Sequence, residues 1–179
     1  MNNRMQPILR LASESDANEI ASLVNKAYRP ASSERGWTHE ADLVSGERIS
    51  ANQVRSLFGP RSTILVLCEQ SAIVACVHLQ SDESGVYIGM LATAPASQAQ
   101  GLGTQMLFQA EQYAVEQFNA STFKMSVLSS RPALIAFYER RGYVRTGKVE
   151  DYPVLAGVGR PIVEGLQLEA LVKKLASRR

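Results

Sequence analysis

The chain of 179 residues contains one stretch that decides its fold: Thr93-Ala94-Pro95-Ala96-Ser97-Gln98-Ala99-Gln100-Gly101-Leu102-Gly103-Thr104. An apolar run from Val86 ends at Thr93, and the residues from Gly101 to Phe118 have the apolar spacing of an amphipathic helix. The stretch is therefore predicted to turn from a strand into a helix. Glycines at 101 and 103 leave backbone N–H groups free at that helix N-terminus, where unpaired donors and a partial positive charge suit a phosphate or diphosphate.

Two common nucleotide-binding patterns do not fit this stretch. A P-loop requires G-x-x-x-x-G-K-[ST], and the sequence has no Gly-Lys followed by Ser or Thr. The dinucleotide fingerprint requires a third glycine at position 106, which is Met106. A Gly-x-Gly alone is weak evidence for a ligand, so the surrounding segments have to decide which ligand is bound.

Upstream of the stretch, the sequence predicts a strand at 8–11 and then a helix from Asp16, with Glu19 as the reciprocal capping acid. Residues 31–48 are predicted to be a loop, and Ser50 caps a short helix that ends near Phe58. Three strands follow, at 63–69, 72–80 and 86–93. The first two form a hairpin.

Downstream, the sequence predicts a strand at 123–128, a helix from Pro132 to Arg141, a strand at 143–149, a glycine-rich loop at 153–161 and a strand at 163–175. The order is β-α-α-β-β-β-α-β-α-β-β, without an internal repeat or linker. It favours a single α/β domain over residues 1–179, with Ser177–Arg179 as a frayed tail.

Composition excludes several classes of protein. An apolar share of 45% and a charged share of 20% are typical of a globular domain. No apolar run in the sequence, Ile64–Cys68 included, is long enough for a membrane span, and the first ten residues lack the apolar core of a signal peptide, so we expect a cytoplasmic protein. The net charge is +2 without a basic and aromatic stripe, which argues against nucleic acid. Two isolated cysteines and two isolated histidines predict no metal site.

Two ordered motifs identify a family. The segment Gln98-x-x-Gly101-x-Gly103 resembles the diphosphate loop of the GCN5-related N-acetyltransferases (GNAT). The segment from Leu134 to Tyr143, LIAFYERRGY, is similar to the second signature of that family. The resemblance covers nearly the whole chain. It implies a mixed, mostly antiparallel sheet with helices on both faces and a splayed central strand pair, the acyl-CoA N-acyltransferase fold.

The resemblance also implies acyl transfer from acetyl-CoA, used as the acyl donor, to an amine. In the family, loop amides bind the diphosphate and the main chain of the preceding strand pairs with the pantetheine arm. The residues at the matching positions are Leu91, Thr93, Gln98, Ala99, Gln100, Gly101, Leu102, Gly103 and Thr104.

Catalytic roles follow from the same resemblance. The backbone N–H of Leu91 would stabilise negative charge on the thioester oxygen. Tyr138 matches the tyrosine that gives a proton to the leaving thiolate, although a Phe-Tyr pair on an amphipathic helix also suits core packing. Tyr143 is predicted to be a core residue. No Ser–His or Cys–His nucleophile is apparent, as direct transfer requires none.

The general base has no clear candidate in the sequence. Some relatives carry a glutamate at the position of Tyr87, which is a poor base at neutral pH. Ordered water, or a carboxylate such as Glu40 or Asp42, would have to remove the proton. Arg131 stands where many relatives have an asparagine, so the hydrogen bond that this asparagine makes in relatives is not assigned to this sequence.

The acceptor side is assigned to the segment from Gly36 to Arg48, which resembles G-W-T-x-E-x-x-L-x-x-G-x-R in a bacterial subgroup of the family. We expect Tyr28, Trp37 and Glu40 to bind a cationic amine. The alternative is that Trp37 only plugs the loop onto the core. The loop at 153–161 is the candidate for the opposite wall.

Three functions remain open from the sequence. The favoured one is N-acetylation of a small-molecule amine, without a metal. The second is acetylation of a protein or peptide amine. The third is a non-catalytic acyl-CoA sensor on the same fold. Homodimers are common among relatives, and the sequence leaves open whether this protein is a monomer or a homodimer.

Overall fold

The computed structural model describes residues 6–31 and 35–176. The helices are α1 (Ala17–Tyr28), α2 (Ala51–Ser56), α3 (Leu102–Phe118) and α4 (Pro132–Glu139), with short 3₁₀ turns at Glu14–Asp16, Pro95–Ser97 and Val154–Ala156. The strands are β1 (Ile8–Leu11), β2 (Val44–Ser45), β3 (Ser62–Glu69), β4 (Ala72–Asp82), β5 (Gly85–Thr93), β6 (Thr122–Leu128), β7 (Val144–Asp151), β8 (Arg160–Pro161) and β9 (Gln167–Lys174). The expected tail at 177–179 lies outside the described residues.

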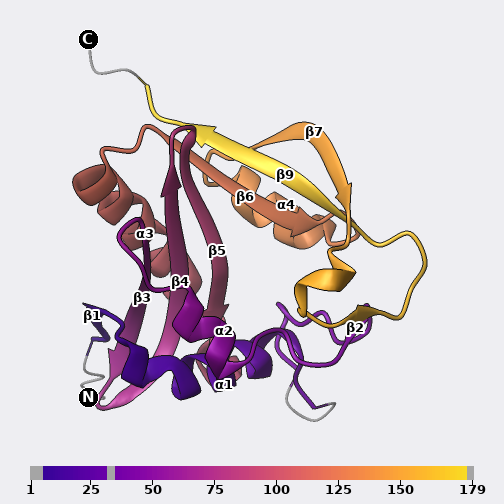
Figure 1. The fold of residues 1–179 in the computed structure, drawn as a ribbon, viewed down its shortest axis with the longest axis horizontal. Helices are drawn as coiled ribbons and strands as arrows, with labels where there is room; N and C mark the ends of the chain where they lie inside the picture. The colour runs from indigo at the N-terminus through magenta and orange to yellow at the C-terminus, as the bar shows by residue number, and fades with distance from the viewer. Residues whose placement is uncertain (1–5, 32–34, 177–179) are drawn as a thin grey trace.

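One seven-stranded sheet organises the molecule, in the order β1-β3-β4-β5-β6-β9-β7. All neighbours are antiparallel except β5 and β6, which are parallel and pair only at Val86–Phe123 and Tyr87–Lys124. Beyond that point the two strands diverge, as Figure 1 shows. The predicted mixed sheet with a splayed central pair is confirmed.

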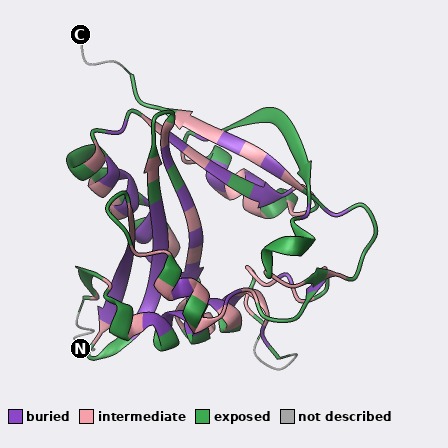
Figure 2. Cartoon of the chain, in the orientation of Figure 1, coloured by how far each residue is buried: buried purple, intermediate pink, exposed green. Residues whose placement is uncertain are grey.

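The central strands are apolar on both faces because both faces are covered. In β3, Leu65 and Leu67 pack in one hydrophobic cluster with α3, while Ile64 and Val66 pack in a second cluster with α1. Figure 2 accordingly shows β3 to β5 as mostly buried, whereas β7 at the edge is exposed. The prediction of helices on both faces is therefore correct.

A β-bulge interrupts β5 at the point where it leaves β6. Cys76 of β4 pairs with Ala92, but His78 pairs with Gly89, so Met90 and Leu91 together oppose a single β4 residue. Met90 has a φ of 53°, in the left-handed region that a side chain rarely adopts. The bulge turns the backbone of β5 at Leu91, and such local strain is typical of functional sites.

Two sequence predictions about local structure are wrong. Asp16 does not form a capping box with Glu19: its carboxylate accepts from the Ser13 N–H and pairs with Arg10, while Glu19 accepts from the Ile73 N–H of β4 at 2.7 Å. Tertiary contacts thus override the local cap. Residues 31–48 are not all loop, because β2 pairs with the distant β8. Two-residue strands have no periodicity that a sequence could reveal.

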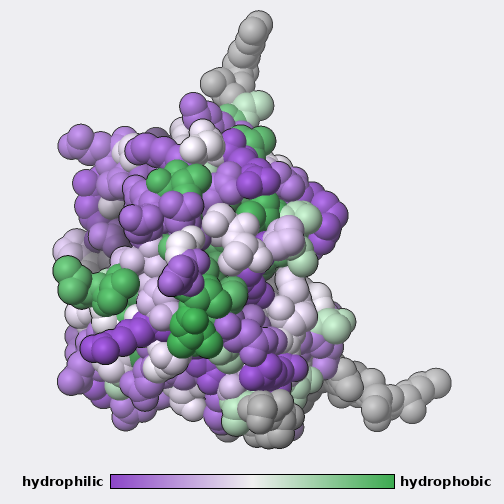
Figure 3. Space-filling model, turned by 90° about the vertical axis from the view of Figure 1, so that its right-hand side faces the viewer, coloured by the Kyte–Doolittle hydropathy of each residue, from purple (hydrophilic) through white to green (hydrophobic). Residues whose placement is uncertain are grey.

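The last strand is shorter than expected, since β9 begins at Gln167 rather than at Val163. The loop that precedes it exposes Val154, Leu155, Ile162 and Val163. Figure 3 views the side on which this loop lies, and apolar side chains form small separate patches there within a polar surface. Within the described residues, no helix combines the length and the apolar character that crossing a bilayer requires.

Candidate active site

Two cavities lie where β5 and β6 diverge. The first, called here the α3 cavity, has a volume of about 220 Å³ and is lined by the start of α3, the end of β5 and the side chains of Trp37 and Phe137. The second, the β6 cavity, has a volume of about 110 Å³ and is lined by Met125–Leu128 of β6, by β5, and by Glu40, Arg48 and Tyr152. Both are bordered by five residues in common: Tyr28, Leu91, Arg131, Leu134 and Tyr138.

The floor of the α3 cavity is backbone. Ala99 and Gly101 have φ angles of 63° and 78°, so the chain makes two left-handed steps before α3 begins at Leu102. The first-turn amides of a helix have no intrahelical acceptor. A Cβ at Gly101 would meet nothing within 4 Å, which leaves open space beside these donors. The start of α3 can therefore hold an anion.

Gln98 fastens the loop before α3 to the segment at 36–38. Its Oε1 accepts from the Trp37 N–H at 3.1 Å, and its Nε2 donates to Thr38 Oγ1 at 3.1 Å and to the Thr93 carbonyl at 3.2 Å. A Cβ at Gly36 would lie 2.2 Å from Gln98 Oε1, so any other residue at position 36 would displace the Gln98 amide from this position. The Gln98 side-chain amide therefore links two segments that line the cavity, the end of β5 and residues 37–38.

The backbone of β5 faces the cavities at Leu91 and Thr93. Ala94 donates to the Val74 carbonyl of β4, and polar groups alternate along a strand, so those of residues 91 and 93 point away from β4. Pairing with β6 has already ended at Tyr87. The Leu91 carbonyl accepts from the Tyr28 hydroxyl at 2.7 Å, which holds the bulge in place.

Tyr138 of α4 stands between the two cavities. It is 7% exposed, its ring packs edge-on against Phe137 and Tyr143, and its hydroxyl has no hydrogen-bond partner among residues 6–31 and 35–176. Burial raises the pKa of the Tyr138 phenol, and the nearby Tyr87 adds to this effect, while Arg131 and Arg141 oppose it. The phenol stays protonated at neutral pH and is free to donate.

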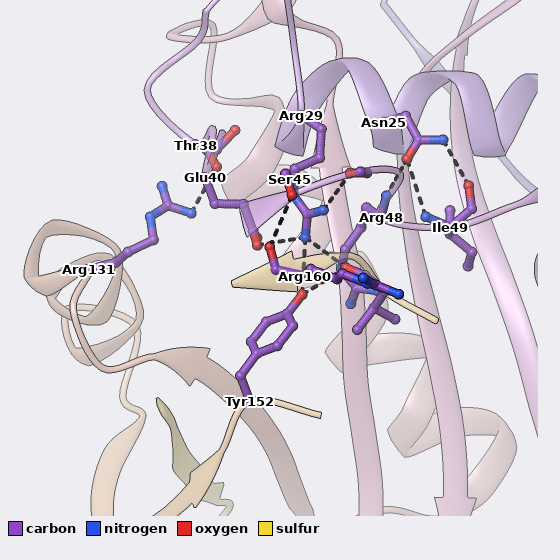
Figure 4. Close-up of polar contacts among 12 residues, drawn as sticks. Asn25, Arg29, Thr38, Glu40, Ser45, Arg48, Ile49, Arg131, Tyr152 and Arg160 are labelled. Carbon is purple, nitrogen blue, oxygen red and sulfur yellow. Dashed lines mark hydrogen bonds and ion pairs between the residues drawn. The ribbon is translucent and has the colours of Figure 1, made fainter. Parts of the chain in front are cut away.

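A buried ion pair forms one wall of the β6 cavity (Figure 4). Arg29 Nη2 lies 3.1 Å from Glu40 Oε2 and also donates to the Tyr152 hydroxyl and the Val158 carbonyl. Both charged side chains are more than 90% buried. The pair ties α1, the 36–48 segment and the loop after β7 together, and it compensates the charge of Glu40, which is the one carboxylate of the cavity lining within residues 6–31 and 35–176.

The family assignment comes from comparison with known proteins. The model of the Acetyltransferase (GNAT) family matches residues 18–143, which include the loop, the bulged strand and α4. The chain belongs to the GNAT acetyltransferase family. The predicted acyltransferase fold and enzymatic class are thus correct.

Known relatives agree with this assignment. The S-(2-succino)cysteine N-acetyltransferase of Bacillus subtilis is 30% identical over 156 residues, covering 80% of this chain and 88% of the relative. The ribosomal-protein-S18-alanine N-acetyltransferase of Escherichia coli has the same fold, with a TM-score of 0.70 and 17% identity over 95% of this chain and 94% of that chain. An acetyltransferase of Bacillus anthracis, solved with acetyl coenzyme A, matches with a TM-score of 0.52 and 17% identity over 66% of this chain and 65% of that chain.

In this GNAT acetyltransferase, most residues predicted for the donor lie together. Eight of them line the α3 cavity, namely Leu91, Thr93, Gln98, Ala99, Gly101, Leu102, Gly103 and Thr104. Gln100 does not line it, because its side chain donates to the Ala96 carbonyl instead. Tyr143 is 1% exposed, so the prediction of a core residue is confirmed.

The expected acceptor wall is divided between the cavities. Trp37 lines the α3 cavity and stacks on Phe137 at 5.8 Å, whereas Glu40 lines the β6 cavity. Tyr28 borders both. Trp37 and Glu40 thus line different cavities, since Gln98 and Arg131 hold Trp37 on the side of α3, and their joint binding of an amine stays a prediction.

Of the other residues predicted from the sequence, some line the β6 cavity and one lies outside it. Tyr87 lines it, as do Pro153 and Val158 of the predicted opposite wall, whereas the exposed Asp42 pairs with Arg35 outside.

Four residues near the site had no role assigned from the sequence. Arg48 and Tyr152 line the β6 cavity, Arg29 supports its wall, and Arg141 donates to Thr104 Oγ1 at 2.6 Å, which places a cation beside the first turn of α3. Arg48 closes the G-W-T segment, and Arg141 lies in the second signature, so both had a signal in the sequence. Tyr152 had none, because it reaches the site only through the fold.

Proposed function

We propose that this enzyme transfers an acetyl group from acetyl-CoA directly to the amine of a small molecule. The observation that carries the proposal is the pair of cavities that share Leu91 and Tyr138. One cavity has the anion-binding start of α3, and the other adjoins it and is lined by both polar and apolar side chains. Donor and acceptor would enter from opposite sides and meet at the shared residues.

The residues of the α3 cavity fit acetyl-CoA. Amides of residues 101–104 would hold the diphosphate, with the Arg141 guanidinium as a nearby countercharge. The outward backbone groups of Leu91 and Thr93 would pair with the pantetheine arm, and Trp37 and Phe137 would cover it. When bound, acetyl-CoA supplies an acetyl group activated as a thioester.

Leu91 and Tyr138 would then act on the two ends of the thioester. The bulge aims the Leu91 N–H away from β4, where it would donate to the carbonyl oxygen as negative charge develops. Tyr138 would donate its phenolic proton to the departing thiolate. The raised pKa of the Tyr138 phenol means that the residue is protonated at neutral pH.

Glu40 is the proposed general base. Its Oε2 pairs with Arg29, but its Oε1 has no partner among the described residues. Since Glu40 is the only carboxylate among the described residues that line the β6 cavity, Oε1 would accept the amine proton, directly or through one water molecule. Tyr87, at the position of the glutamate in some relatives, would border the amine without taking its proton.

A small-molecule acceptor is favoured over a peptide because the β6 cavity is small and closed on one side by the 153–158 loop. It also agrees with the relative that acts on S-(2-succino)cysteine. The bacterial subgroup and a cytoplasmic location stay predictions from the sequence, which leaves the choice between monomer and homodimer open.

Calorimetric titration with CoA and a thiol-release assay on a panel of amines test this function. We expect CoA to bind and at least one small amine to accelerate thiol release from acetyl-CoA. Binding of CoA without release by any amine or peptide would favour the sensor. Release only with peptide N-termini or lysine peptides would favour the protein acetyltransferase.

A further inference from the structure

The β6 cavity has an excess of positive charge. Three charged residues line it: Glu40, Arg48 and Arg131. Glu40 is already paired with Arg29, which reaches it from the neighbouring wall. The two arginines therefore face the cavity without a carboxylate to balance them.

Arg48 is the less constrained of the two. Its backbone N–H donates to Asn25 Oδ1 at 2.7 Å, which fixes the main chain, and its guanidinium lies 5.8 Å from the centre of the Tyr28 ring. That guanidinium forms no hydrogen bond or ion pair within the described residues. A half-buried arginine without an anion, in the wall of a cavity, is available for a ligand carboxylate.

Arg131 is positioned by the backbone of the 37–38 segment. It donates to the Thr38 carbonyl at 2.8 Å and to the Trp37 carbonyl at 3.1 Å, and Figure 4 shows it turned toward Thr38. Because these carbonyls carry no net charge, the positive charge of Arg131 is not balanced by them. Its place between the two cavities adds to the positive potential near Tyr138.

We infer that the acceptor is an amine that also carries a carboxylate, such as an α-amino acid, and that Arg48 binds this carboxylate. The inference rests on the proposed function and names its substrate class. A guanidinium presents paired donors that match a carboxylate in two parallel hydrogen bonds. The remaining lining, including Met125, Val127 and Leu168, would contact an apolar part of the acceptor.

The charges oppose a cationic acceptor. A polyamine would place additional positive groups beside Arg48 and Arg131, and like charges at close range in a partly buried site repel. Within the described part of the chain, the one carboxylate that lines the cavity is Glu40, which already has Arg29 as its partner.

Matched acceptors test the inference directly. With saturating acetyl-CoA, kcat/KM is measured for methionine against methioninamide and for S-(2-succino)cysteine against spermidine. We expect each carboxylate compound to exceed its counterpart by about 10- to 100-fold, the value of a charged hydrogen bond. Preference for the amide or for spermidine would overturn the inference while leaving the proposed function intact.

Variants assign the effect to Arg48. In Arg48→Gln, the preference for methionine over methioninamide should fall about tenfold or more, with the KM for acetyl-CoA unchanged. Arg48→Lys should retain part of the preference. Arg61→Gln removes an equal charge from an exposed position that lines neither cavity, and should leave the preference as it is. An unchanged preference in Arg48→Gln would overturn the role of Arg48.

These experiments distinguish failure of the inference from failure of the proposed function. If CoA does not bind, or if no amine accelerates thiol release, the function and the inference fail together. If release occurs but acceptors are chosen without regard to their carboxylate, only the inference fails. Should Arg48→Gln not fold, a reduced but remaining carboxylate preference in Arg48→Lys, or competition of succinate with the amine and not with acetyl-CoA, would support the inference, and an unchanged preference in Arg48→Lys would overturn the role of Arg48.

Discussion

At the residue scale, the chemistry depends on side chains whose polar atoms face a cavity instead of the protein. The Tyr138 hydroxyl and Glu40 Oε1 both lack partners among the residues that the structure describes, whereas the Tyr143 hydroxyl, beyond the end of α4, donates to Glu111 Oε1 at 2.8 Å. Two tyrosines five positions apart thus have different roles. The second is a structural residue buried against α3.

The pair Tyr138 and Tyr143 gives a matched test of the proton donor. Tyr138→Phe should lower kcat about 100-fold or more, because the thiolate loses its donor, while the melting temperature changes little. Tyr143→Phe should lower stability by about 1–3 kcal/mol, because Glu111 loses a buried hydrogen bond, and leave kcat unchanged. Steady-state kinetics and thermal melts of both variants check this. Equal kcat values in the two variants would exclude Tyr138 as the donor.

Glu40 and Asp42 provide a second matched pair. In Glu40→Gln, kcat/KM at pH 7 should fall about 100-fold, and the deficit should shrink as the pH rises and more of the amine is already neutral. Asp42→Asn, which alters an exposed carboxylate outside both cavities, should behave as the unmodified enzyme. A pH–rate profile distinguishes the cases. Identical pH–rate profiles for the two variants would indicate that water alone removes the proton of the amine.

At the scale of elements, the sequence predicts what is local and misses what depends on distant contacts. The helix from position 102 and the turn before it follow from apolar spacing and two glycines. The bulge at Met90, the β2–β8 pair and the separation of Trp37 from Glu40 depend on partners that are far apart in sequence. For the same reason, the eight loop and strand residues of the α3 cavity could be predicted, whereas Tyr152 and the charge of the β6 cavity could not.

At the scale of the whole molecule, one sheet with two covered faces supports the site. The central strands β3 to β5 are mostly buried, and β4 holds a buried titratable residue, His78, which is 6% exposed. Its Nε2 lies 2.7 Å from Ser62 Oγ. Burial lowers the pKa of His78 to about 4.

The stability of the sheet should therefore depend on pH. Below pH 6.5 the unfolded chain binds a proton at this histidine, but the folded protein does not until about pH 4. Stability is full above pH 6.5 and falls by about 3 kcal/mol as the pH drops to 4. Denaturant unfolding at pH 7.5 and pH 4.5 measures this change, which His78→Gln should reduce. The same slope in His78→Gln would assign the loss to other groups.

The central claim is that the start of α3 binds the diphosphate of coenzyme A, and a charge introduced there tests it most directly. A Cβ at Gly103 would lie 3.8 Å from Thr93 Oγ1, an ordinary contact, so a side chain fits. An acidic residue in the first turn stabilises a helix but repels a bound anion. Calorimetric titration with CoA should therefore show Gly103→Asp binding about tenfold or more weakly than the neutral Gly103→Asn, with an equal or higher melting temperature. Equal affinities in the two variants would contradict the claim.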